Sequence, residues 1–300
     1  MQTLQDWEKQ GRFFSYRSHR IFYQYETTQT NTDEILLCIH GYPTASWDWV
    51  KMWQSLTTHF QVVAPDMIGF GFSDKPLSYP YHIIDQAELH EQLLHHLGIK
   101  KVHILAHDYG DTVAQELLAR YEDRQKNKQE GINIQSIAFL NGGLFPETHR
   151  ARFAQKLLLS PIGSWVARLF TEKRFRATFK GIFGAQTSPT EQEYKDFWYL
   201  ATREGGKKIQ HKLIRYMEDR RQNRARWVGA LQSTQVPLCV IDGADDPVSG
   251  AHMVDRYREL VPNPNTVLLK GIGHYPQVEA PELVWNAFWQ FIAPLSEKKL

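Results

Sequence analysis

The sequence predicts an α/β fold in which a mostly parallel, doubly wound sheet carries an inserted helical cap. Short, continuous apolar runs, typical of buried parallel strands, alternate with amphipathic helical segments. Residues 146–230 break this rhythm, because they contain helical segments and Gly/Pro breaks but no convincing strand. The simplest organisation is a core formed by residues 1–145 and 231–300, with a helical cap at 146–230 inserted between two strands.

The expected elements follow in chain order. Residues 13–26 are aromatic and alternate with polar residues, which predicts a β-hairpin. Short apolar runs predict buried strands at 35–40, 62–66, 102–107, 136–141, 237–242 and 266–270. Amphipathic patterns predict helices at 47–60, 86–98, 112–125 and 281–292. Gly98 is expected to end the second of these helices.

The composition is ordinary for a globular enzyme. The chain has 300 residues, of which 42% are hydrophobic and 23% charged, and its net charge is +2. This small net charge argues against a nucleic-acid partner. The charge is uneven, however, because residues 147–230 carry 18 Lys and Arg against 8 Asp and Glu. That excess indicates either a solvated helical surface or contact with an anionic or membrane surface.

Cysteine usage and hydropathy favour an intracellular setting. Cys38 and Cys239 lie inside apolar runs, which predicts buried side chains without a disulfide. No stretch reaches the roughly 18 apolar residues that a membrane span needs. The N-terminal segment also lacks the continuous apolar region of a secretory signal. We therefore expect a cytoplasmic protein.

The residues after the predicted strand 102–107 form a candidate nucleophile elbow. Asp108 lies between that strand and a helix, with the small residues Ala106 and Gly110 two positions to either side. A carboxylate in this position is already ionised at neutral pH, so it can attack sp³ carbon directly and form an alkyl-enzyme ester. The alternative is that Asp108 only caps the following helix.

Two further residues stand where a catalytic base and its orienting acid belong. His274 follows the predicted strand 266–270 and precedes the last helix, which is the position of the base in this strand order. The acid should follow the strand 237–242, where the loop GADDP offers Asp245 and Asp246; we favour Asp246. Asn141, at the end of the strand before, is not a carboxylate.

Other residues have predicted roles around this set. The backbone amides of Tyr42, in an H-G-x-P turn, and Tyr109 are expected to form an oxyanion hole, although both rings could also line a cavity. Tyr216, His107 and Trp47 are expected to line the substrate site. Two other carboxylates are read as structural, Asp66 in a turn and Asp111 in the first helical turn beside the dipole. No ligand spacing predicts a metal or a cofactor.

Taken together, these motifs resemble the epoxide hydrolase and haloalkane dehalogenase branch of the α/β-hydrolase superfamily. More closely, the chain resembles the mesoderm-specific transcript protein family. The shared strings are HGYPTASWDW, GFGFSDKP, HDYGD, NGGLFPETHR, RWVGAL and HYPQ, and they extend over nearly the whole chain. The resemblance implies an α/β-hydrolase fold and a hydrolase that acts on a small apolar organic substrate with water.

Departures from the branch favour one reaction. Haloalkane dehalogenases hold the halide with an Asn and a Trp, whereas here the corresponding residues are Tyr42 and Tyr109. Epoxide hydrolases use cap tyrosines to protonate the epoxide oxygen; the cap offers Tyr194, Tyr199 and Tyr216, of which Tyr216 is preferred. The resemblance therefore implies an epoxide hydrolase-like enzyme. A dehalogenase, an esterase or lactonase, and a non-catalytic binding protein remain as alternatives.

Overall fold

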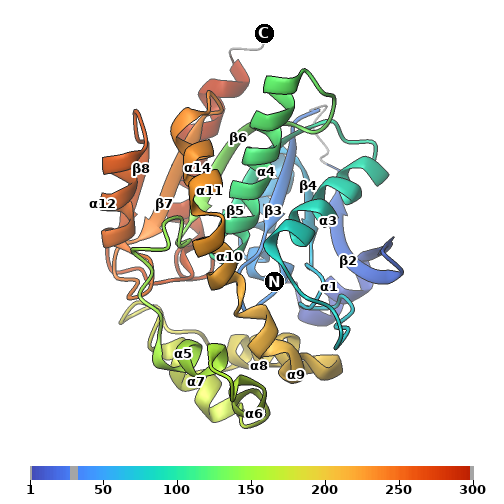
Figure 1. The fold of residues 1–300 in the computed structure, drawn as a ribbon, viewed down its shortest axis with the longest axis vertical. Coiled ribbons are helices and arrows are strands. Elements are labelled where there is room, and N and C mark those ends of the chain that lie inside the picture. Colours follow the sequence, from blue (N-terminus) through green and yellow to red (C-terminus); the bar gives the residue numbers. More distant parts are fainter. Residues whose placement is uncertain (1, 28–32, 298–300) are drawn as a thin grey trace.

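A mixed sheet organises the chain, and its strands are the buried apolar runs. The computed structural model describes residues 2–27 and 33–297, and in this part of the chain the sheet has the order β1-β2-β4-β3-β5-β6-β7-β8 (Figure 1). β2 pairs antiparallel with β1 and β4, and all other pairs are parallel. The strands are β1 Arg12–Tyr16, β2 His19–Glu26, β3 Ile35–Ile39, β4 Gln61–Pro65, β5 Lys101–His107, β6 Asn133–Leu140, β7 Leu238–Gly243 and β8 Thr266–Leu269. The predicted hairpin and the predicted mostly parallel sheet are confirmed.

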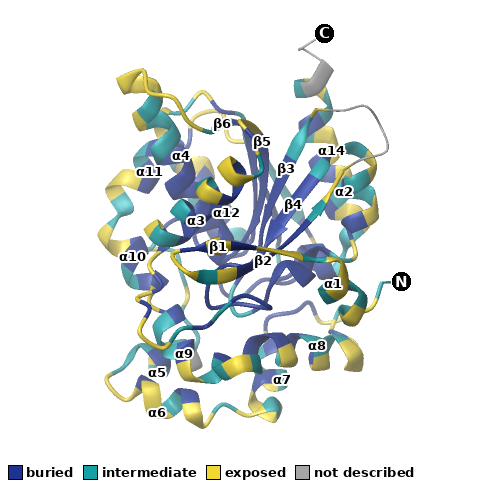
Figure 2. Cartoon of the chain, turned by 90° about the vertical axis from the view of Figure 1, so that its right-hand side faces the viewer, coloured by how far each residue is buried: buried dark blue, intermediate teal, exposed yellow. Residues whose placement is uncertain are grey.

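Helices cover both faces of this sheet (Figure 2). Before β6 and after β7 the helical elements are α1 Leu4–Gln10, η1 Ser46–Trp49, α2 Trp53–His59, α3 Ile83–His96, α4 Tyr109–Asn127, α12 Ala251–Leu260, α13 Pro276–Glu279 and α14 Pro281–Glu297. Between β6 and β7 they are α5 Phe153–Leu159, α6 Gly163–Arg168, α7 Glu172–Lys180, α8 Glu191–Thr202, η2 Arg203–Gly205, α9 Gly206–Leu213, α10 Tyr216–Gln222 and α11 Arg224–Ser233.

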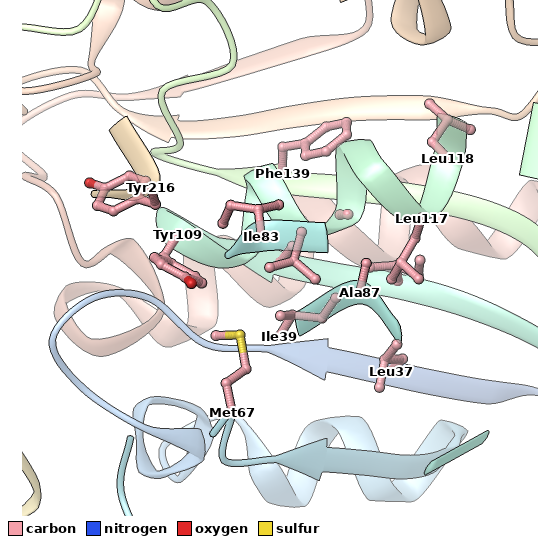
Figure 3. Close-up of a cluster of buried hydrophobic side chains, with 14 of the residues drawn as sticks. Leu37, Ile39, Met67, Ile83, Ala87, Tyr109, Leu117, Leu118, Phe139 and Tyr216 are labelled. Carbon is pink, nitrogen blue, oxygen red and sulfur yellow. The ribbon is translucent and has the colours of Figure 1, made fainter. Parts of the chain in front are cut away.

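The continuous apolar runs arise because the central strands β3, β4, β5, β6 and β7 are buried on both faces. Successive side chains of a strand point to opposite sides of a sheet. Leu37 and Ile39 of β3 accordingly join the core cluster beneath α3 and α4, which Figure 3 shows together with Ala87. Leu36 and Cys38 join the other cluster, which includes residues of α2 and α14. Both faces of such a strand therefore favour apolar side chains.

The helical segment between β6 and β7 has two parts. Helices α5–α9 lie beyond the end of the sheet where α4 begins (Figure 1). Helix α11 instead runs along α4, where Glu116 accepts hydrogen bonds from Trp227 Nε1 at 2.7 Å and Arg226 Nε at 2.9 Å. Because α11 packs against a helix of the core, the division of the chain at residue 230 remains a prediction.

The prediction of one helix over residues 47–60 is wrong. The structure has the short 3₁₀ helix η1, then a turn, then α2. All four residues of η1 are buried, including Trp47, Asp48 and Trp49, whereas an amphipathic surface helix buries only one face. Tertiary packing of these neighbouring side chains therefore overrides the helical pattern.

Candidate functional site

Asp108 lies at a sharp turn between β5 and α4. Its backbone has φ 48° and ψ −103°, a conformation that L-residues seldom adopt and that is typical of strained functional turns. The turn requires a small residue behind it, because a methyl group on Gly110 would lie 2.4 Å from the carbonyl oxygen of Ile39. The sequence pattern around Asp108 thus reflects the close approach of α4 to β3.

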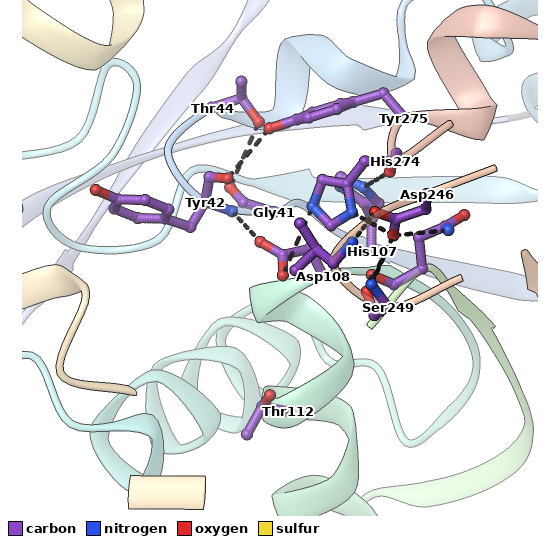
Figure 4. Close-up of polar contacts among 12 residues, drawn as sticks. Gly41, Tyr42, Thr44, His107, Asp108, Thr112, Asp246, Ser249, His274 and Tyr275 are labelled. Atoms are coloured by element: carbon purple, nitrogen blue, oxygen red, sulfur yellow. Dashed lines mark hydrogen bonds and ion pairs between the residues drawn. The ribbon is translucent and has the colours of Figure 1, made fainter. Parts of the chain in front are cut away.

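The two carboxylate oxygens of Asp108 face different groups (Figure 4). Oδ2 accepts a hydrogen bond of 3.0 Å from the backbone N–H of Tyr42. Oδ1 lies 3.9 Å from His274 Nε2 and 3.9 Å from Arg220 Nη2. The side chain is almost completely buried. One oxygen is therefore held by the main chain, while the other faces two cationic groups.

His274 and Asp246 form a hydrogen-bonded pair behind Asp108. His274 Nδ1 lies 2.8 Å from Asp246 Oδ2, so its Nε2 is left to face Asp108. The structure brings Asp246 to the histidine, whereas the adjacent Asp245 is exposed. The Asp246 carboxylate also accepts hydrogen bonds from the Val248 amide at 2.7 Å and the Asn141 side chain at 3.0 Å.

The surroundings of His274 favour its protonated form. Burial by itself lowers the pKa of His274, but the negative charges of Asp246 and Asp108 and the Asp246 hydrogen bond outweigh it and raise the pKa to about 9. Burial likewise opposes ionisation of Asp246, yet the His274 charge and the hydrogen bonds to the carboxylate lower the pKa of Asp246. These surroundings favour an imidazolium in the resting site.

The predicted substrate contacts His107 and Trp47 lie beside this set. His107 Nε2 is 2.8 Å from the carbonyl oxygen of His274, and burial followed by the His274 charge lowers the pKa of His107 to about 3. A neutral His107 can thus donate to that carbonyl and hold the backbone of the base. Trp47 is buried and lines a cavity of about 940 Å³ together with Phe197 and Val278, and Asp108 is not among the lining residues. A substrate role for either residue remains a prediction.

Tyr42, Tyr109 and Tyr216, three of the predicted site tyrosines, lie together near Asp108. The Tyr216 ring is 4.9 Å from the Tyr109 ring and 6.2 Å from the Tyr42 ring, measured between centroids. Burial and the Asp108 charge raise the pKa of Tyr216 far above its ordinary value, so its hydroxyl stays protonated. Tyr109 occupies the first position of α4, where a backbone N–H lacks an intrahelical acceptor. The oxyanion role of that amide remains a prediction.

The two carboxylates expected to be structural differ in their surroundings. Asp66 accepts hydrogen bonds from the amides of Ser46 at 2.8 Å and Phe72 at 2.7 Å, as a turn residue does. Asp111 is fully buried, and neither of its oxygens has a hydrogen-bond partner among the described residues. Burial and the nearby Asp242 raise the pKa of Asp111 well above its usual range. This shift opposes ionisation of Asp111, which lies in the first turn of α4, and the expected charge–dipole interaction remains a prediction.

Arg220 and Asn141 are neighbours of the site that the sequence reasoning did not select. Arg220 of α10 is 2% exposed, and its Nη2 donates a 3.1 Å hydrogen bond to the backbone oxygen of Asp108. Arg220 stands beside Arg221 in a basic run that reads as solvated surface, so nothing local marks it as buried. Asn141 is not a carboxylate, but its side-chain amide donates a hydrogen bond to Asp246 Oδ2.

Neither a metal site nor a membrane span emerges from the residues described. Within residues 2–27 and 33–297, no three His, Cys, Asp or Glu side chains are grouped so that they could hold a metal ion. In the same ranges no helix combines the length and the apolar character needed to cross a bilayer. Both cysteines are free and buried.

Comparison with known proteins gives the family. A model of the α/β hydrolase fold family matches residues 34–281. The mesoderm-specific transcript protein of Mus musculus is 42% identical over 300 residues, covering 97% of this chain and 88% of the mouse protein. Among solved structures, the epoxide hydrolase CorEH superposes with a TM-score of 0.77 at 18% identity, covering 95% of this chain and 99% of CorEH. The haloalkane dehalogenase DbeA from Bradyrhizobium elkani superposes with a TM-score of 0.79 at 20% identity, covering 96% of this chain and 99% of DbeA.

The solved structures share the fold, and the mouse protein is similar in sequence over nearly the full chain. The predicted fold class is confirmed. The chain belongs to the α/β hydrolase fold family, in the group of the mesoderm-specific transcript proteins.

Proposed function

We propose that the protein is a cofactor-independent hydrolase in which Asp108 is the nucleophile. The observation that supports this most directly is that the two Asp108 oxygens have different partners. Tyr42 N–H holds Oδ2 at 3.0 Å, while Oδ1 faces His274, whose other ring nitrogen is paired with Asp246. In the first step Oδ1 forms a bond to an sp³ carbon, the substrate bond to the leaving atom breaks, and an alkyl-enzyme ester results.

The second step hydrolyses that ester. His274 takes a proton from water, and the hydroxide attacks the carbonyl carbon of the Asp108 ester. Negative charge then develops on Oδ2, where the Tyr42 amide is already placed. Alkylation also removes one of the negative charges that raise the pKa of His274. The histidine, protonated at rest, therefore gives its proton to the departing oxygen and becomes a base at the stage where a base is needed.

An epoxide is the substrate class that we favour. Tyr216 supplies a protonated hydroxyl near Asp108 that can donate a hydrogen bond to the oxygen of an opening epoxide while keeping its proton, since its pKa is raised far above the ordinary value. The predicted cap, residues 146–230, then covers this site with helices α5–α9 and contributes Tyr216 from α10. Dehalogenation is disfavoured because Tyr42 and Tyr109 replace the halide-holding Asn and Trp of dehalogenases. An aspartate nucleophile disfavours an esterase or lactonase, and the assembled set of ionisable groups disfavours a non-catalytic protein.

Isotope labelling tests the nucleophile. A single turnover of 1,2-epoxyhexane in heavy-oxygen water should leave label in the Asp108 carboxylate, because water attacks the ester carbonyl. His274→Gln should accumulate an alkyl adduct that mass spectrometry detects on Asp108, and Asp108→Asn should form none. Turnover that leaves Asp108 unlabelled would exclude the mechanism. A parallel assay with 1-bromohexane separates epoxide opening from halide release.

We also propose that α5 and α6 contact an anionic membrane surface. Four large apolar side chains are exposed on or beside these helices, namely Phe153, Ile162, Trp165 and Leu169. Residues 150–180 around them include eight Lys and Arg and one acidic residue. Exposed apolar side chains surrounded by cations are typical of helices that lie in the headgroup region of anionic membranes.

Vesicle sedimentation tests this surface. The protein should sediment with phosphatidylglycerol-containing vesicles and not with pure phosphatidylcholine vesicles, since the cations need an anionic surface. Ile162→Ser combined with Leu169→Ser should abolish sedimentation. Leu283→Ser, a change at another exposed leucine in α14, is the control and should leave it unchanged. Binding that survives the double change would exclude α5 and α6 as the contact.

A further inference from the structure

Arg220 is a buried cation inserted from α10 against the nucleophile elbow. Its Nε donates a 2.6 Å hydrogen bond to Thr112 Oγ1, and its Nη2 donates to the backbone oxygen of Asp108 at 3.1 Å. The guanidinium carbon lies 4.5 Å from the centre of the Tyr216 ring. These contacts fix the position of the guanidinium.

In the resting site the charge of Arg220 is balanced by Asp108, whose Oδ1 lies 3.9 Å from Nη2. Asp111 is also close enough to feel the Arg220 charge, but burial and the charges of Asp242 and Asp108 raise its pKa well above its usual range. His274 and Asp246 balance one another. When Asp108 becomes an ester it loses its negative charge, and a buried cation without a counter-charge is strongly unfavourable. A substrate that carries an anionic oxygen at this stage removes that penalty.

Arg220 Nη1 and the ring of His149 both lie beside Gly143, which follows β6. Arg220 Nη1 and both ring nitrogens of His149 are buried, and none has a hydrogen-bond partner among the described residues. Both groups approach Gly143, where an added methyl group would meet Nη1 at 2.3 Å and His149 Nδ1 at 3.2 Å. Burial and the Arg220 charge lower the pKa of His149 to about 3, so the ring is neutral and has one N–H to donate.

We propose that Arg220 Nη1 and His149 form a binding site for an anionic oxygen of the substrate, next to Asp108. The inference rests on the proposed function, and it narrows the substrate to one whose reacting bond is C–O. Asp108 Oδ1 bonds to the carbon, the C–O bond breaks, and its electron pair stays on the departing oxygen, which Arg220 and His149 hold. The proton of the resting His274 imidazolium neutralises that oxygen, and the proton that His274 later takes from water restores the imidazolium, so one water is added overall.

Asp108→Asn provides the test, because the neutral amide imitates the charge of the ester. Isothermal calorimetry should detect hexanoate binding to Asp108→Asn, with affinity about tenfold or more above that of wild type, since Arg220 then lacks its counter-charge. Neutral hexanamide should not compete. The double variant Asp108→Asn/Arg220→Gln should lose hexanoate binding, whereas Asp108→Asn/Arg221→Gln, altered at the exposed neighbouring arginine, should retain it.

Several outcomes would overturn the site. These are equal affinity for hexanoate and hexanamide, equal affinity in wild type and Asp108→Asn, or binding that survives in a folded Arg220→Gln double variant. Chloride that displaces hexanoate at equal concentration would also contradict an oxygen-selective site. If the Arg220 double variant does not fold, Asp108→Asn/His149→Phe replaces it and should weaken hexanoate at least about fivefold. None of these measurements needs turnover, so they are independent of the oxygen-label experiment on Asp108.

Discussion

The site holds its charges in two adjacent pairs. His274 lies 2.8 Å from Asp246, and Arg220 lies 3.9 Å from Asp108, while His274 and Asp108 are themselves 3.9 Å apart. Each buried charge thus depends on a neighbour. A chemical step that removes the charge of Asp108 should therefore lower the pKa of His274 and leave the Arg220 guanidinium without its counter-charge.

Asp108→Asn should lower the pKa of His274 from about 9, because the negative charge of Asp108 is one of the groups that raise it. Titration of the His274 imidazole by NMR measures the shift. Asp245→Asn is the control: it removes a nearby but exposed carboxylate and should leave the value unchanged. An unchanged pKa in Asp108→Asn would show that the two groups are not coupled.

Among the elements, the contact between β3 and α4 sets the position of the nucleophile. Helix α4 begins directly after Asp108, and Gly110 lets its first turn approach the backbone of β3. Further along the same helix, Arg120 pairs with Glu91 of α3 at 2.8 Å. The elbow is thus fixed by close backbone packing as well as by its own dihedral angles.

Gly110→Ala should therefore destabilise the fold by roughly 1–3 kcal/mol, because the new methyl group forces α4 away from β3. Chemical denaturation measures the change. The matched control is Gly229→Ala in α11, where an added methyl group meets nothing within 4 Å. That change should be neutral or stabilise by up to about 1 kcal/mol, since alanine favours a helix. Equal stability of the two variants would contradict the close approach.

At the scale of the whole molecule, the protonation of the site is linked to the stability of the fold. The pKa of His274 is raised from 6.5 to about 9 on folding, because Asp246 and Asp108 outweigh burial. A raised pKa means that the folded state binds the proton more tightly than the unfolded state does. This contribution to stability is complete below about pH 6.5 and is lost as the pH rises through 9.

Asp246→Asn should remove most of that dependence. Thermal unfolding of wild type and variant between pH 6 and pH 10 should show a stability difference that is largest at the acid end and shrinks towards the alkaline end. Because Lys75 and other groups titrate in the same range, the difference between the two proteins is the measured quantity. A difference that is constant over this range would contradict the linkage.

The strands, their order along the chain and the elbow could be predicted from the amino-acid sequence alone. Central parallel strands are buried on both faces, so their apolar runs are continuous and visible without a structure. The small residues beside Asp108 are visible for a similar reason, since the turn imposes a local requirement. The sequence also offered His274 and the two loop carboxylates, Asp245 and Asp246, but it could not show which carboxylate reaches the histidine.

The tertiary structure shows that Asp246 is the carboxylate that reaches His274, and it places the other neighbours of Asp108. Arg220 comes from a helix more than a hundred positions along the chain from Asp108, and its local surroundings are those of a solvated basic run. Asn141 and His149 likewise reach the site only through the fold. The break of the predicted 47–60 helix has the same origin, since burial of η1 depends on distant packing. Patterns along a chain record local periodicity, whereas burial and pairing of charges depend on residues far apart in sequence.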